Sequence, residues 1–227
     1  MSTQQIPPFT RAALTLLFAP DNFLAFQKPG FPSHYWAPLL AAGAGASRNE
    51  VFFLHPEDLI QHGDQWWLRL RSMGEANAPT REVPLHPWLQ QLGLVEFVTE
   101  CRQQAPQDRL FAEYKAGREQ AGMPFSRAFV QWIKTTVAGL AADQQQLFAE
   151  DFHFPSLRAL FWLQAERAGL SESTAQFLRG GTGDRELATV EVSRIAIASC
   201  FPSLPPYSAL CRHLDDHQGG PAPAIIP

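Results

Sequence analysis

Cysteine is scarce in this sequence, and its three thiols lie far apart, at Cys101, Cys200 and Cys211. None belongs to a Cys-x-x-Cys pair, the spacing typical of a metal site, and an odd number excludes a framework in which every cysteine is paired. We therefore expect reduced thiols in a cytoplasmic protein, with no bound metal and no other cofactor.

Long apolar runs and an excess of positive charge are also missing. No stretch approaches the roughly 18 apolar residues of a membrane-spanning helix, so no membrane partner is expected. Residues 1–8 have neither a basic start nor an apolar core, which predicts that they are not a signal peptide. The 18 Lys and Arg are outnumbered by 22 Asp and Glu, giving a net charge of −4. This balance argues against a broad basic surface for nucleic acid but leaves room for a local basic patch.

The sequence does contain enough apolar material for one sizeable core. Hydrophobic residues make up 45% of the 227 positions, as in soluble globular domains. We expect residues 1–20 to form an arm and a short helix, and residues 21–215 to form the main domain. Residues 216–227, rich in Gly, Pro and Ala, are expected to be a flexible tail.

Apolar periodicity and turn residues predict the order of the elements. Residues 65–71 alternate as a strand does, and residues 20–32 are typical of a loop. Helices are expected at residues 11–18, 36–46, 88–101, 126–133 and 187–198, with a last half-buried turn at residues 211–217.

The most informative stretch is residues 152–181, where a pair of helices is marked at its boundaries. Ser156 can cap the first helix with its hydroxyl, and Pro155 opposes a backward extension. Gly169 permits the left-handed residue that commonly ends a helix. A Gly pair at residues 180–181 ends the second, shorter helix. The stretch therefore predicts two consecutive helices with well-defined ends.

Several short segments, taken together, resemble a known family. They are Val-Pro-Leu-His-Pro at residues 83–87, Arg-Leu-Phe-Ala-Glu at 109–113, and Pro-Ser-Leu-Arg at 155–158 followed by Ala-Gly at 168–169. Their order and spacing resemble the catalytic domain of the tyrosine recombinases, the phage-integrase family, over about residues 9–181. The resemblance implies a mainly α fold with a small antiparallel β-sheet (α+β), the sheet lying within about residues 54–85.

The resemblance also implies which catalytic groups are retained. In that family two arginines hold the phosphate, a lysine and histidines move protons, and a tyrosine attacks phosphorus. Here Arg158 stands at the second arginine, but Ser47 stands at the first, Pro155 at the first histidine and Gly181 at the second. No lysine lies between residues 66 and 87, where the family has one. The resemblance therefore implies a pseudoenzyme that no longer cleaves DNA strands.

Some of the missing catalytic residues have nearby side chains that could take over their roles. Arg48 follows the first arginine position by one residue, about 100° round a helix, so it is either a displaced phosphate ligand or a surface arginine paired with an acid. His153 is either a displaced proton-transfer group or a histidine bonded to nearby backbone. Tyr207, the only tyrosine after residue 181, needs a relocated phosphate site to act as a nucleophile. Cys200 aligns near the nucleophile's place, although buried cysteines are usually inert.

Two classes of function remain open. In the first, the protein binds duplex DNA and belongs to the integration or recombination of a mobile element without cutting a strand; the candidate DNA-binding residues are Arg69, Arg71, Arg81 and Arg158. In the second, the same fold is a protein-interaction module that binds itself or a recombinase and no longer touches DNA. Arg158 is accordingly a phosphate ligand or an internal anchor of its helix.

Overall fold

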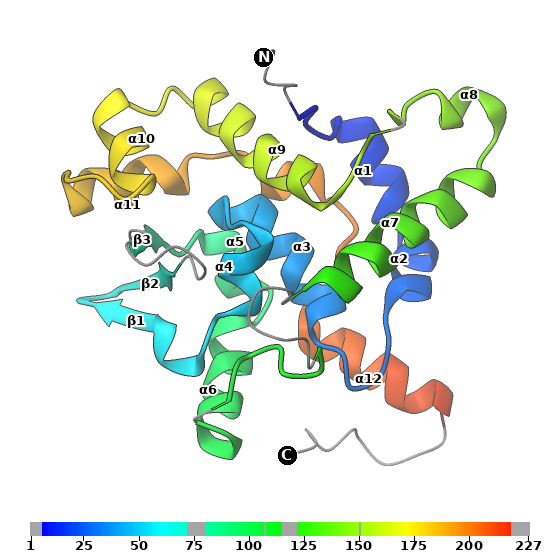
Figure 1. The fold of residues 1–227 in the computed structure, drawn as a ribbon, viewed down its shortest axis with the longest axis horizontal. Helices are drawn as coiled ribbons and strands as arrows, with labels where there is room; N and C mark the ends of the chain where they lie inside the picture. The colour runs from blue at the N-terminus through cyan, green and yellow to red at the C-terminus, as the bar shows by residue number, and fades with distance from the viewer. Residues whose placement is uncertain (1–5, 72–79, 107, 115–121, 150, 219–227) are drawn as a thin grey trace.

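Two helices at the centre of the molecule organise the fold. The computed structural model describes residues 6–71, 80–106, 108–114, 122–149 and 151–218. Helices α3 (Ser33–Ala44) and α9 (Phe154–Arg167) pack against each other more extensively than any other two helices (Figure 1). Every residue of α3 is buried, and its Ala and Gly side allows close helix packing.

The other α-helices surround this central pair. They are α1 (Arg11–Leu17), α2 (Pro20–Phe26), α4 (Arg48–Phe52), α5 (Pro87–Gln91), α6 (Leu94–Gln104), α7 (Met123–Ala138), α8 (Ala142–Gln145), α10 (Glu172–Leu178), α11 (Arg185–Ser193) and α12 (Tyr207–Gln218).

The β-sheet has three antiparallel strands in the order β1 (Leu59–His62), β2 (Gln65–Leu70) and β3 (Arg81–Pro84). Leu68 lies opposite Leu59 and Val83, and all three side chains are buried. Helices α10 and α11 pack against β3 (Figure 1). This architecture confirms the predicted fold class, a mainly α protein with a small antiparallel sheet.

Helix α9 begins earlier than the sequence predicted. Its N-cap is His153, and Ser156 Oγ accepts a hydrogen bond from the backbone N–H of His153 (3.3 Å). Pro155 lies in the first turn, where its missing N–H leaves no donor unsatisfied. The prediction of Ser156 as the N-cap is therefore wrong. The predicted end is confirmed, because Gly169 follows the last turn with a φ of 72°.

Two further sequence predictions are wrong for identifiable reasons. The predicted loop at residues 20–32 contains α2, which starts at Pro20 and buries Phe23 and Phe26. The helix predicted at residues 88–101 is two helices, α5 and α6. Gly93 separates them with a φ of 94°, and a left-handed residue cannot continue a right-handed helix.

The C-terminal elements also differ from the prediction. The helix predicted at residues 187–198 is α11, which begins and ends earlier than predicted, at Arg185 and Ser193. It begins there because the Asp184 side chain caps the helix by accepting from two backbone N–H groups. The half-buried turn predicted at residues 211–217 belongs to the longer helix α12. The predicted tail lies outside the described residues from residue 219 onward, and the predicted domain boundaries stay a prediction.

His86 joins the sheet to the C-terminal segment and must be neutral to do so. Its Nδ1 accepts a hydrogen bond from the backbone N–H of Trp88 (3.0 Å). The proton therefore lies on Nε2, which donates to the carbonyl of Ile195 (2.9 Å). Burial lowers the pKa of His86 below its ordinary value of 6.5.

We expect the free energy of unfolding to fall as the pH drops below about 6.5, because the unfolded chain then binds a proton that folded His86 binds only at lower pH. The loss is about 1.4 kcal/mol for each unit by which folding lowers the pKa, and it is complete at the folded pKa. Urea unfolding of the wild type and of His86→Asn across this range measures it. Asn keeps a capping acceptor but does not titrate, so its stability should vary less with pH; parallel curves would contradict this account.

Candidate nucleic-acid interface

A buried ion pair between Arg81 and Glu50 lies where α3, α4, α10 and β3 meet. Arg81 Nε donates to Glu50 Oε1 (2.7 Å) and Nη2 to Oε2 (3.1 Å), with side chains only 5% and 7% exposed. The remaining guanidinium bonds go to the carbonyls of Leu178 (2.8 Å) and Gly45 (2.9 Å). Arg81 is therefore bonded to three separate segments of the chain.

Glu50 is held by a second set of bonds at the start of α4. Ser47 caps this helix: its Oγ accepts from the N–H of Glu50 (3.3 Å), and Glu50 Oε2 accepts from the N–H of Ser47 (2.6 Å). Burial alone would raise the pKa of Glu50, but the hydrogen bonds and charge of Arg81, together with Ser47, hold it below its ordinary value. Ser47, aligned with the family's first arginine, thus serves as a helix cap.

Arg158 on α9 lies near this ion pair, and its guanidinium is less completely hydrogen-bonded than that of Arg81. Its side chain is half-buried, and its Nε is buried without a hydrogen-bond partner among the described residues. Burial lowers the pKa of Arg158, the charge of Glu50 opposes that change, and the like charge of Arg81 adds to it. The charge of Glu50 thus acts on two guanidinium groups, but both of its carboxylate oxygens are bonded to Arg81. The local charge balance is positive, which favours an anion.

Arg48 and His153, the side chains considered as displaced catalytic groups, have other partners in the structure. Arg48 Nη1 lies 2.8 Å from Met123 Sδ at the start of α7, and its buried Nε has no acceptor within the part of the chain that is described. His153 Nδ1 bonds to the carbonyl of Asp151, the local backbone contact considered above. The structure therefore gives no bond from either side chain to Arg158, and their catalytic roles stay predictions.

Tyr207 lies at the start of α12, against the first turn of the central helix α3. Its ring packs against Tyr35, Trp36 and Phe97, with centroids 5.0–5.3 Å away. Burial, with nearby cysteine side chains, raises its pKa. This placement opposes the nucleophile role considered for Tyr207, because its ring lies among aromatic side chains and the raised pKa disfavours the phenolate that would attack. Cys200 is similarly buried, and burial raises its thiol pKa.

The other predicted DNA-binding arginines have acidic partners. Arg71 Nη2 lies 2.6 Å from Asp58 Oδ1 and 3.2 Å from Glu57 Oε1, while Arg69 Nε lies 3.6 Å from Glu82 Oε1. Both side chains remain about one-third exposed, at 35% for Arg69 and 37% for Arg71. Their contact with DNA stays a prediction, as does that of the buried Arg81, whose bonds within the protein oppose it.

The sequence-based reasoning passed over two exposed arginines. Arg179 ends α10 and Arg185 begins α11, with side chains 56% and 50% exposed. The signal available in the sequence was the run Arg-Gly-Gly-Thr-Gly-Asp-Arg at residues 179–185, in which two arginines flank a glycine-rich turn. The glycines of that run predicted a helix end and the place of the family's second histidine, and the two flanking arginines were given no role.

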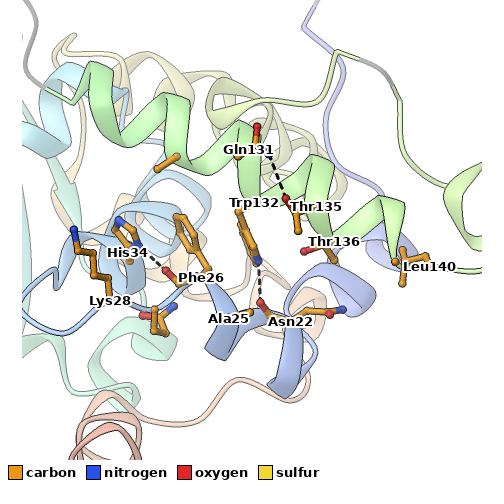
Figure 2. Close-up of a pocket in the computed structure, with 13 residues that line it drawn as sticks. Asn22, Ala25, Phe26, Lys28, His34, Gln131, Trp132, Thr135, Thr136 and Leu140 are labelled. Atoms are coloured by element: carbon orange, nitrogen blue, oxygen red, sulfur yellow. Dashed lines mark hydrogen bonds between the residues drawn. The ribbon is translucent and has the colours of Figure 1, made fainter. Parts of the chain in front are cut away.

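A surface groove of about 610 Å³ lies elsewhere, between α2 and α7 (Figure 2). Trp132 of α7 points across it and donates from Nε1 to the carbonyl of Asn22 (2.8 Å), and its ring stacks on Phe26 at 4.4 Å. Lys28 is the one lining residue with a full charge. No residue predicted for catalysis or DNA binding lines this groove, so we assign it no role in the candidate interface.

The described residues contain neither a metal-binding cluster nor a membrane-spanning helix. No group of three or more His, Cys, Asp or Glu side chains is arranged to hold a metal ion there. In the same ranges, no helix has the length and apolar character needed to cross a bilayer.

Comparison with known proteins supports the fold. No family model matches the sequence, and no curated protein matches it. A solved structure does: the Tn1549 transposon integrase, carrying a tyrosine-to-phenylalanine substitution, in complex with transposon right end DNA. The identity is 15% and the TM-score 0.52, over 96% of this chain and 68% of that one. This likeness, with the helices and sheet described above, shows that the protein has an integrase-like fold.

Proposed function

We propose that this protein binds duplex DNA on an integrase-like fold without cleaving a strand, and that it acts in the integration or recombination of a mobile element. The observation that carries the proposal is the half-buried Arg158 guanidinium, which lies beside a carboxylate already bonded to Arg81. A guanidinium in this position is stabilised by an added anion, and a phosphate can accept two of its N–H groups at once.

Loss of cleavage is supported by the catalytic roles taken together. Ser47, Pro155 and Gly181 have no side chain that can replace an arginine or a histidine in phosphoryl transfer. Residues of a catalytic unit act together, so one remaining member restores little of the rate. A retained arginine can still hold a phosphate, because that task is electrostatic and needs no proton transfer.

We expect the protein to bind fluorescently labelled duplex DNA, with log K falling linearly as log salt rises. Arg158→Ala should weaken binding about ten-fold and reduce the slope by about 1, because one phosphate contact is lost. Arg167→Ala is the matched control, because Arg167 is an exposed arginine on the same helix and its substitution removes the same charge. Fluorescence anisotropy over a salt series measures both quantities.

A nicked suicide duplex tests the loss of cleavage separately. The expected result is no covalent protein–DNA adduct on a denaturing gel. An adduct would overturn the pseudoenzyme part of the proposal, and equal losses in Arg158→Ala and Arg167→Ala would overturn the phosphate role of Arg158.

A protein-interaction module is the second candidate, favoured by one surface feature. Leu187 and Val190 on α11 are 38% and 46% exposed, and they lie on one side of the helix. The net charge of −4 also suits a protein that does not bind DNA. If the wild type shows no salt-dependent DNA binding, sedimentation of the protein alone and with a recombinase tests this candidate.

A further inference from the structure

We propose that the turn between α10 and α11, together with Arg179 and Arg185 at its two ends, holds the phosphate backbone of duplex DNA. The proposal rests on the DNA binding proposed above and adds a second contact region to that of Arg158. Its elements are two arginines that each lie over an indole ring, and an exposed turn between them that carries almost no side chains.

Arg179 is positioned by Trp162 of α9. Its guanidinium carbon lies 4.7 Å from the centre of the Trp162 ring, a cation–π contact. Its acidic neighbour, Glu172, is 3.9 Å away and 75% exposed, so this ion pair is weak and screened. Trp162 is one turn after Arg158 on the same side of α9. Arg158 and Arg179 therefore lie at neighbouring places on one surface.

Arg185 is positioned in the same way at the other end of the turn. Its guanidinium lies 5.6 Å from the centre of the Trp67 ring, and it bonds to Glu82 and to His62 Nε2 (3.2 Å). Glu82 is shared, because Arg69 Nε also lies 3.6 Å from its Oε1. One carboxylate thus serves two arginines, which leaves Arg185 able to bind a further anion.

The turn between the arginines packs closely against the end of α10 and exposes backbone N–H groups. A Cβ on Gly181 would lie 3.0 Å from the carbonyl oxygen of Gln176, and one on Gly183 would lie 2.8 Å from Phe177 Cβ. The glycines are therefore required by the packing. The N–H groups of Thr182 and Gly183 have no acceptor among the described residues, and both residues are exposed. Backbone N–H groups are common donors to DNA phosphates.

The fixed position of both guanidinium groups favours phosphate recognition. An arginine that already lies on an indole ring loses less side-chain freedom when it binds than a free surface arginine does. The carboxylate of Asp184, the one acid in the turn, accepts from the N–H groups of Glu186 and Leu187 and so is directed to α11. The turn can therefore present N–H donors and guanidinium groups together.

The test measures the binding of a labelled mixed-sequence duplex by fluorescence anisotropy over a salt series. We compare the wild type, Arg179→Ala, Arg185→Ala and the double variant with the control Arg194→Ala, an exposed arginine directly after α11. Each single variant should bind about ten-fold more weakly, and the double variant should lose about 2 from the salt slope. Arg194→Ala should match the wild type. Because these side chains are exposed, all variants should have the wild-type melting temperature.

Trp162→Leu tests the positioning role of the indole. It should weaken binding while leaving the salt slope near that of the wild type, since the arginine charge is still present. Double-variant binding equal to that of Arg194→Ala, with Arg158→Ala still impaired, would overturn this inference and leave the proposed function standing. A wild type that does not bind DNA would overturn both. The same variants are also measured for binding to labelled polyglutamate, a simple acidic polypeptide. If the double variant lost polyglutamate binding but kept DNA binding, this inference would be overturned and the turn would be assigned to an acidic protein partner.

Discussion

Replacing Arg81 with methionine should lower the free energy of unfolding by about 3–5 kcal/mol, because it leaves the Glu50 carboxylate buried without its counter-charge. The carbonyls of Gly45 and Leu178 would lose a donor as well. Such a loss is a large part of the roughly 5–15 kcal/mol that stabilises a typical domain. Urea unfolding followed by circular dichroism measures it for Arg81→Met.

Arg69→Met is the matched control for this substitution. Arg69 lies on β2 directly beside Leu70, the residue opposite Arg81, and it pairs with Glu82 at 3.6 Å, but its side chain is 35% exposed. Exposed pairs contribute only about 0–1 kcal/mol. Adding Glu50→Gln to Arg81→Met should recover part of the loss, since no charge then remains buried. If Arg81→Met were no more costly than Arg69→Met, Arg81 would not have the structural role assigned to it.

Gly45→Ala should destabilise the protein by about 2–5 kcal/mol, as the sum of two costs. Gly45 ends α3 with a φ of 60°, a conformation that costs about 1–2 kcal/mol for a residue with a Cβ. The new Cβ would also lie 2.6 Å from Phe161 Cδ1 of α9, a distance at which the buried Phe161 ring or the helix that carries it must shift. The midpoint of urea unfolding reports the combined effect.

Gly63→Ala separates the two costs. Gly63 has nearly the same φ, 59°, but an added Cβ there meets no atom within 4 Å. It should therefore show only the backbone cost of about 1–2 kcal/mol. Phe161→Leu combined with Gly45→Ala should be more stable than the sum of the two single changes predicts, because the smaller side chain relieves the contact. Equal losses at Gly45 and Gly63 would exclude the proposed clash.

The substitutions Arg81→Met and Gly45→Ala both change the packing around Arg158. Gly45 contributes its carbonyl to Arg81 and its bare Cα to the packing of Phe161, which lies one turn after Arg158 on α9. Movement of α9 away from α3 would therefore shift the guanidinium relative to Glu50. We expect any Gly45→Ala protein that still folds to bind DNA more weakly than Gly63→Ala, for the same duplex and salt.

The amino-acid sequence by itself determined the fold class and the ends of several helices. Gly169 was predicted to end α9, and it does so because only glycine adopts a positive φ there at little cost. Short segments such as residues 83–87 were sufficient for the family resemblance, since their order follows the order of the elements. These are local features, and each depends on residues within a few positions of one another.

The tertiary structure decided which side chains form the candidate interface. Arg81 was predicted to contact DNA, which stays a prediction, but its guanidinium is bonded to Glu50 and to the carbonyl of Leu178, which lie 31 and 97 positions away in the chain. Tyr207 was considered only by its place after Gly181, whereas the fold packs its ring against the first turn of the central helix α3. Burial and charge pairing depend on contacts between residues far apart in the chain. Local patterns predict helices and turns, and they do not predict which distant side chains share one cavity or one carboxylate.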